Sequence, residues 1–198
     1  MRVSWAAMKR PNSKAYVCGH CGNQVASAEA FEGTYTDGSH FADIYICHHC
    51  GGPTLFVPGG KQVPGVPFGS VVRNVSEKSV ADLYEEARNA TSANAFTAAV
   101  MCCRKLLMHI AVDKGADPGE TFAHYVDYLA EHHYVPPDAS QWVDRIRTRG
   151  NEANHEIRIM EQADAAELIS FSEMLLKLIY EFPASVGEPP VGASEASE

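Results

Sequence analysis

Two Cys-x-x-Cys pairs restrict the fold of this 198-residue chain more than any other feature of its sequence. The pairs read Cys18-Gly-His-Cys21 and Cys47-His-His-Cys50, each is followed by a glycine, and residues 22–46 separate them. Each pair can place two thiolates on one side of a tetrahedral ion, and the glycine allows the tight turn behind them. Two such pairs complete a four-sulfur site, so we expect Cys18, Cys21, Cys47 and Cys50 to bind one zinc ion per chain.

Two other uses of paired cysteines fit this pattern less well. A reducing cytosol disfavours structural disulfides, and a thioredoxin-like redox site uses one pair on a βαβ background rather than two matched pairs. A histidine could replace one sulfur, although four cysteines already complete the set. With every position filled by protein, no site remains for water, and we expect a structural zinc ion. The histidines that could substitute are His20, His40, His48 and His49.

The residues around the cysteine pairs predict a small β unit followed by a linker. Phe31, Tyr35 and the run 41–46 are aromatic or rich in branched residues, which is typical of short strands. We therefore expect residues 1–58 to form an N-terminal zinc ribbon. Residues 59–75 are rich in Pro and Gly and contain too many helix breakers for a helix, so they are expected to form an extended linker.

Beyond residue 75 the apolar residues recur with helical spacing. In the segment 96–110 they lie three or four positions apart, and Gly115 follows as an expected C-terminal cap. The segment 165–182 has Asp164 and Glu167 as an expected capping pair and Pro183 as an expected stop. Further helices are expected near 80–87, where Ser79 is the predicted cap, and near 122–129 and 138–146.

Short connections between these segments predict an antiparallel bundle of about five helices over residues 76–183. The expected fold is mainly α, with this bundle preceded by the small β zinc ribbon. Residues 184–198 are rich in Pro, Ser and Glu and are expected to be a disordered tail.

The charge distribution and hydropathy exclude several functions. Residues 1–75 carry a net charge of +2 and residues 76–198 a net charge of −11, so tight nonspecific binding of nucleic acid is not expected. No apolar run approaches the roughly 20 residues of a membrane helix, and the N-terminus lacks a signal-peptide core. We expect a cytoplasmic protein without a membrane partner.

One local exception to the acidic character is the segment 147–156, Arg-Thr-Arg-Gly-Asn-Glu-Ala-Asn-His-Glu. A histidine near neutral pKa can exchange a proton with a ribose hydroxyl or leaving oxygen, and an arginine can neutralise a phosphate. Asn151 and His155 are four positions apart and would share a helix face. Arg149 and His155 are six apart, which places them about 120° apart on an unbroken helix. A break at Gly150, or a symmetric dimer, would be needed to bring them together.

A simpler interpretation of this segment involves no chemistry. Gly150 would end one helix, Asn151 would cap the next by accepting from free amides, and Glu152 would favour the positive end of the helix dipole. His155 would then face wherever packing places it.

The same residues resemble the HEPN superfamily, whose motif is an arginine, four to six residues, and a histidine. The pattern RxxGNxAxH, followed by the helix expected over 165–182, is similar to a bacterial domain family of unknown function, whose members occur alone, behind zinc ribbons or in phage-defence proteins. The resemblance covers about residues 75–183 and implies a homodimeric helical domain. Active HEPN members cleave RNA without metal and leave a 2′,3′-cyclic phosphate.

Carried over to this chain, the resemblance implies an endoribonuclease of a defence or toxin-like system. His155 would be the general acid/base, Arg149 the phosphate clamp and Asn151 an orienting residue. The glycine directly after Arg149 departs from the polar residue that active members often have there. Local RNA contacts are expected from Arg145, Arg147 and Arg158.

Two alternatives remain open at the level of sequence. The first is a noncatalytic module that binds nucleic acid or a partner protein of a defence or restriction complex. The second is a structural subunit in which the asparagine and histidine only fix a helix junction.

Overall fold

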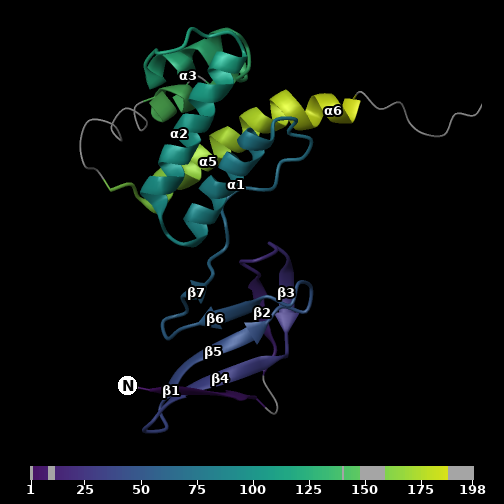
Figure 1. The fold of residues 1–198 in the computed structure, drawn as a ribbon, viewed down its shortest axis with the longest axis vertical. Coiled ribbons are helices and arrows are strands. Elements are labelled where there is room, and N and C mark those ends of the chain that lie inside the picture. Colours follow the sequence, from purple (N-terminus) through teal and green to yellow (C-terminus); the bar gives the residue numbers. More distant parts are fainter. Residues whose placement is uncertain (1, 9–11, 140, 148–158, 187–198) are drawn as a thin grey trace, which may run out of the picture. The chain divides into compact units, whose positions relative to one another are not determined.

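The computed structural model describes residues 2–8, 12–139, 141–147 and 159–186. Contacts divide the chain into two units. The first comprises Met1–Phe68 with Asn89–Ala95, and the second comprises Gly69–Arg88 with Phe96–Glu198. In the described residues all strands belong to the first unit (Figure 1).

The described residues of the first unit form seven antiparallel strands in two sheets. The larger sheet has the order β1-β4-β5-β6-β7, and the smaller one is a hairpin of β2 and β3 (Figure 1). The strands are β1 (Val3–Ala7), β2 (Lys14–Val17), β3 (Gln24–Ser27), β4 (Ala30–Tyr35), β5 (His40–Ile46), β6 (Pro53–Phe56) and β7 (Gln62–Val63).

The prediction of a mainly α protein with only a small β ribbon is wrong. Strands extend from Val3 to Val63 and build a five-stranded sheet in addition to a hairpin, so the chain combines a substantial β unit with helices. The strand-like residues recognised in the sequence lie mainly between the two cysteine pairs, in residues 22–46. Strands such as β1 are short and rich in alanine, and they are defined by their hydrogen-bonded neighbours rather than by their own residues.

One face of the five-stranded sheet forms the core of the first unit with the hairpin. Ala30 and Tyr45, which pair across β4 and β5, are buried together with Tyr16 and Val25 of the hairpin. The Tyr16 ring lies 6.5 Å from that of Tyr45 and 5.2 Å from that of Phe56, centroid to centroid. Aromatic edge contacts therefore join the two sheets.

The helices begin with α1 (Lys78–Ser92), whose last residues belong to the first unit. The second unit continues with α2 (Phe96–Asp113), α3 (Phe122–Glu131), the 3-10 turn η1 (Pro137–Ala139) and a helical segment over residues 141–147. It ends with α5 (Gln162–Leu176), the π-helical turn η2 (Lys177–Glu181) and α6 (Phe182–Val186).

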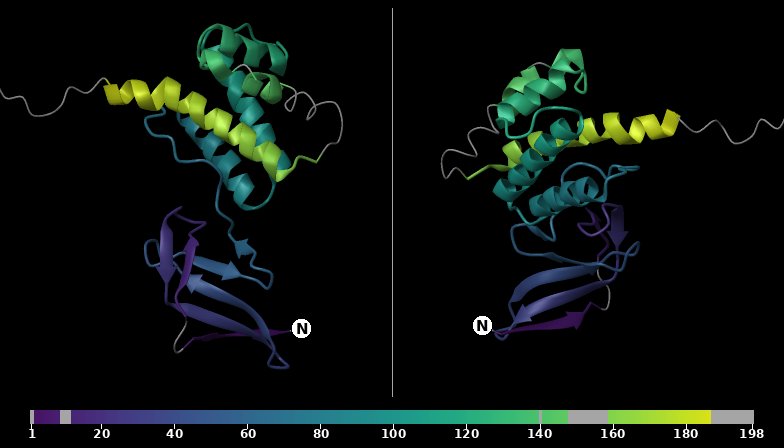
Figure 2. Two further views of the ribbon diagram at one scale, coloured as in Figure 1. Left: turned by 180° about the vertical axis from the view of Figure 1, so that it is seen from behind. Right: turned by 45° about the horizontal axis from the view of Figure 1, so that its top comes forward.

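The core of the second unit lies where α2 packs against α3 and α5. Figure 2 shows α2 and α5 crossing side by side from two further directions. The predicted apolar stripes face this contact, because Leu107 and Ile110 of α2 and Leu168, Phe171 and Leu175 of α5 have no exposed surface. In the described part of the chain, no helix has both the length and the apolar character that crossing a membrane requires.

Three predicted helix boundaries are wrong. The last helix starts at Gln162, and Asp164 accepts from the Glu161 amide at 3.0 Å as the third residue of the first turn rather than as its cap. Its helical conformation continues through Pro183 to Val186, after the turn widens at η2. The first helix begins at Lys78, so Ser79 lies inside it.

The α2 packing predicts a large difference between two positions on one helix. Replacing the fully buried Leu107 with alanine should lower the free energy of unfolding by about 2–5 kcal/mol, because it leaves a cavity between helices. Replacing the exposed Val112 with alanine should change it by less than about 0.5 kcal/mol. Urea denaturation followed by circular dichroism measures both, and equal losses would contradict the assigned core.

Candidate metal centre

The two cysteine pairs occupy equivalent turns between strands. Cys18 follows β2 and Cys47 follows β5, and each turn leads into the strand that pairs with the one before it. The Gly22 amide donates to the Cys18 carbonyl at 2.8 Å, and the Gly51 amide donates to the Cys47 carbonyl at 2.7 Å. Both glycines have φ near +70°, a conformation that side chains disfavour, which explains the glycine after each pair.

The four sulfur atoms converge on one point of the first unit. Cys18 Sγ lies 3.8 Å from Cys50 Sγ, and Cys21 Sγ lies 3.9 Å from Cys47 Sγ. All four sulfurs lie within 4.8 Å of one another. Four sulfurs about 2.3 Å from a tetrahedral ion would be separated by about 3.8 Å, so the observed distances fit such a site. The prediction that these four cysteines come together in a cluster that could hold a metal ion is confirmed.

Hydrogen-bond donors approach two of the sulfur atoms, and those at Cys21 lower its pKa. The His20 amide donates to Cys18 Sγ at 3.4 Å, and Asn23 Nδ2 donates to Cys21 Sγ at 3.4 Å. Hydrogen bonds from Asn23 lower the pKa of Cys21 to about 6. Asn23 was not identified from the sequence, although a polar residue two positions after a cysteine pair is a usable signal.

The thiol of Cys50 shows the opposite behaviour. The Gly52 amide acts to lower its pKa, but desolvation and the three other thiols outweigh this and raise the pKa to about 12. Four thiolates at this separation repel one another, so they ionise together only around a cation. The donor set therefore fits a divalent metal ion.

The histidines proposed as substitutes for a sulfur are not part of the cluster in the described residues. His20 Nε2 lies 2.9 Å from the Pro53 carbonyl oxygen, and His40 Nε2 lies 2.9 Å from a neighbouring carboxylate. His48 and His49 are exposed. The site is therefore built from sulfur alone.

The remaining cysteines lie in α2 and play no part in this site. Cys103 has no exposed surface, and burial raises the pKa of its thiol to about 12, which makes it a poor nucleophile and metal ligand. Cys102 is half-buried and is not among the four residues of the cluster. These cysteines behave as small apolar residues.

Two of the arginines predicted to contact RNA have acidic partners. Arg145 Nε lies 2.5 Å from a carboxylate oxygen of Glu167. The Arg147 guanidinium lies 3.2 Å from Asp127 and 2.9 Å from Asp144. These pairs are partly exposed and therefore contribute little stability, so a phosphate could compete for either guanidinium.

The other residues of the predicted catalytic site are not placed. Arg149, Asn151, His155 and Arg158 lie outside the described residues. Their convergence on a phosphate stays a prediction from the sequence.

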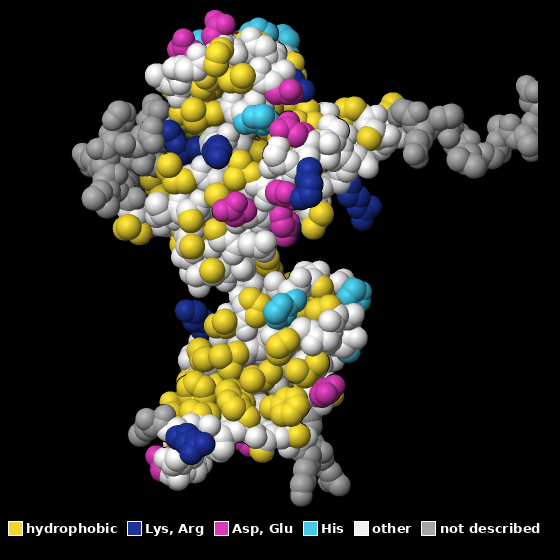
Figure 3. All heavy atoms as spheres, viewed as in Figure 1, with side chains coloured by type: hydrophobic (Ala, Val, Ile, Leu, Met, Phe, Trp, Pro, Cys, Tyr) yellow, Lys and Arg dark blue, Asp and Glu magenta, His cyan; other side chains and the backbone are white. Residues whose placement is uncertain are grey.

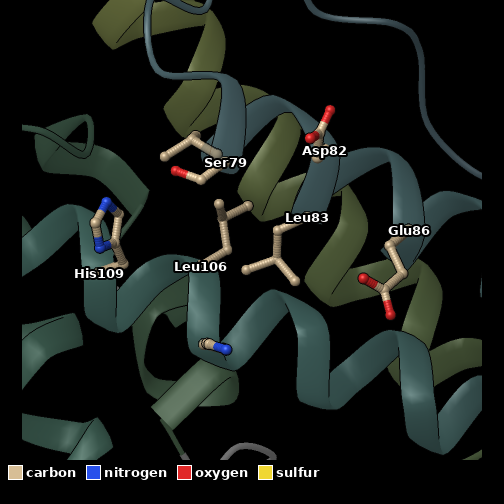
Figure 4. A pocket seen from close by; sticks show the side chains of 8 residues that line it. Ser79, Asp82, Leu83, Glu86, Leu106 and His109 are labelled. Carbon is tan, nitrogen blue, oxygen red and sulfur yellow. The ribbon is translucent and has the colours of Figure 1, made fainter.

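A groove between α1 and α2 was not anticipated from the sequence. It encloses about 280 Å³, and Figure 4 shows Leu83 and Leu106 at its centre with Asp82, Glu86 and His109 around them. Two of its charged side chains have ion-pair partners, since Asp82 pairs with Lys78 and His109 pairs with Glu77. Ser79 and His109 both line the groove, but each bonds to Glu77 rather than to the other, so they do not form a nucleophile and base pair.

A β unit with four clustered cysteines is followed along the chain by a set of helices, and this combination defines the class of protein. Residues 85–188 match the model of a family described as a domain of unknown function, DUF4145. The match covers more than half of the chain, so the chain belongs to this family. No curated protein and no solved structure matches it. The resemblance to a family of unknown function is confirmed, and the wider HEPN assignment stays a prediction.

The cluster predicts one bound metal ion per chain that depends on each sulfur. Cys47→Ser should release the ion, because Cys47 is fully buried and supplies one of four ligands. Cys102→Ser is the matched control and should retain it. Elemental analysis of both purified proteins measures the content, and full metal content in Cys47→Ser would refute the assigned ligand set.

Proposed function

We propose that the four cysteines hold one structural zinc ion that stabilises the first unit. The support is a closed set of four thiolates, two of which, Cys18 and Cys47, belong to the apolar core of that unit. A zinc ion with four protein ligands has no position for water and contributes directly to folding. The ion would join the turn after β2 to the turn after β5.

Four sulfur ligands also suit iron, so the identity of the ion needs its own test. We expect zinc, and a colourless protein. Visible absorption from iron and thiolate, together with iron in the elemental analysis, would contradict the zinc assignment and leave the metal cluster itself intact.

We further propose that the helical domain is a metal-independent endoribonuclease. The observation that carries this proposal is the Arg149 to His155 motif, which falls inside the family match over residues 85–188. His155 would take the proton of a ribose 2′-hydroxyl as that oxygen bonds to phosphorus, and Arg149 would stabilise the negative charge on the phosphate oxygens. The bond from phosphorus to the 5′-oxygen would break, and that oxygen would leave as a hydroxyl after receiving a proton. Asn151 would orient the histidine, and the product would carry a 2′,3′-cyclic phosphate.

The ion pairs of the neighbouring arginines refine this proposal. Arg147 bridges Asp127 and Asp144, so its first role in the motif region is to hold the helical segment 141–147. RNA would be held by few cations on an acidic domain, so its binding should be weak and should fall with salt along a shallow slope. A defence or toxin-like setting follows from the resemblance and is part of the proposal.

The nuclease proposal predicts a specific pattern among variants. His155→Ala and Arg149→Ala should each lower RNA cleavage by at least about 100-fold, because each removes a group that acts on the reacting phosphate. His124→Ala, which replaces an exposed histidine of α3, should leave the rate unchanged. Cleavage of labelled RNA without added divalent ions, with mass spectrometry of the product ends, measures both rate and chemistry.

A chelator that removes trace divalent ions from this assay can also remove the proposed structural ion. Zinc content and circular dichroism are therefore measured on each sample after the reaction. Equal cleavage by all variants would assign the activity to a contaminant, and no cleavage by any protein on a range of RNAs would remove the nuclease proposal.

A noncatalytic binding module is the second candidate, favoured by the acidic partners of Arg145 and Arg147. These pairs give both arginines partners within the protein, so their presence does not require a catalytic role. If the domain is a binding module, His155→Ala should bind nucleic acid or a defence-complex protein as well as the wild type does. A gel-shift series in increasing salt separates nucleic-acid binding from protein binding, because only the binding of RNA or DNA would follow the phosphate-dependent salt slope.

A further inference from the structure

The five-stranded sheet packs against the hairpin with only one of its two faces. The inner face carries Ala30, Tyr45 and Thr54, which are paired across β4, β5 and β6 and are buried. The outer face carries the odd-numbered residues of β1, β4, β6 and β7 and residues 42, 44 and 46 of β5, because directly paired residues point to the same side.

A β-bulge adds one more aromatic ring to the outer face. The register between β4 and β5 shifts at Gly33 and Thr34, which leaves Phe41 without a direct partner. The Phe41 ring lies 6.0 Å from Trp5 and 5.2 Å from Tyr35 in edge-to-face contacts, so it shares their side of the sheet. A side chain at Gly33 would overlap the Trp5 ring, which lies over that position.

None of the outer-face positions carries Lys, Arg, Asp, Glu or His. Several of their side chains are nevertheless open to solvent: Trp5 is 42% exposed, Val63 is 44% exposed, and Ile44 and Leu55 are half-buried, whereas Ala42 is fully buried. Figure 3 shows apolar side chains gathered over this sheet. An antiparallel sheet with a solvated face normally alternates apolar and polar residues, and a continuous apolar patch marks an interaction site.

We propose that the outer face is the interface with a second copy of this chain, packed sheet on sheet. Its lack of cations argues against nucleic acid, whose binding requires neutralisation of phosphates. A symmetric dimer places each residue of a face near the same face of the partner, where like charges would repel, and a face without charge meets this condition. Aligned sheets pack about 10 Å apart through interdigitating apolar side chains of this kind.

The size of the sheet fits a weak dimer. A sheet of this length and width covers roughly 20 Å by 20 Å, which corresponds to about 400 Å² per copy and about 800 Å² in total. That area is below the range of stable interfaces and within that of weak, transient ones, so we expect association only at micromolar or higher concentrations. The aromatic group of Trp5, Tyr35 and Phe41 would supply the anchoring contacts. The interface does not depend on the nuclease proposal.

Sedimentation of the full, metal-loaded chain over a wide concentration range tests the proposal. The wild type should dimerise, and Ile44→Lys should weaken the dimer by at least about 100-fold, because it buries an unpaired charge at the centre of the face. Val112→Lys replaces a comparably exposed apolar residue on α2 and is the matched control, with unchanged association expected. If the Ile44→Lys variant loses its metal or its fold, the same measurement uses the Trp5→Lys variant, whose substitution lies on the edge strand β1.

A fluorescence measurement locates the interface independently. The chain has two tryptophans, so Trp142→Phe leaves Trp5 as the only reporter. Its quenching by acrylamide should fall as the protein concentration rises and the dimer forms. This protection should be absent when Ile44→Lys is added.

Three results would overturn the proposal. The first is a monomer at every concentration with Trp5 open to quencher. The second is a dimer that survives both lysine substitutions in the sheet. The third is a monomer in which Trp5 is already shielded, since the face would then be covered by something other than a second copy.

Discussion

Two turns of the first unit bring four sulfur atoms together, and this closure joins its two sheets. The hairpin of β2 and β3 and the larger sheet meet through a few aromatic rings, and the cysteine turns at the ends of β2 and β5 lie beside this contact. The three neighbouring thiols oppose the ionisation of Cys50 and raise its pKa. A bound cation would convert that repulsion into a link between the two sheets and so compensate for a limited core.

Local chemistry determined which features were predictable from sequence. The spacing within each cysteine pair and the glycine after it encode half of the cluster within five residues, and the match between the two pairs predicts that the halves meet. The apolar stripes of α2 and α5 are equally local, and Leu107, Phe171 and Leu175 are buried as their periodicity indicates. Strands such as β1 and β7 are defined by partners distant in the chain, so the extent of the β unit was missed.

The candidate functional residues also differ in whether local sequence or contacts formed on folding determine their surroundings. Asn23 supports the cluster through a hydrogen bond that depends on how the turn folds, and no motif names it. Arg145 and Arg147 look like phosphate ligands in a list of residues, but folding places Glu167, Asp127 and Asp144 beside them. Charge composition alone cannot distinguish a free cation from a paired one. Family membership extends over the helices and carries no activity with it.

The irregular step between β4 and β5 decides which side chain of β5 joins the aromatic rings. With the bulge, His40 pairs with Thr34 and lies on the same side as Glu32 and Asp43, with its ring 2.9 Å from the Asp43 carboxylate. A regular strand that kept Ala42 opposite Gly33 would exchange the sides of His40 and Phe41. An imidazole would then stand among the aromatic rings, on a face whose paired positions carry no acidic or basic side chain.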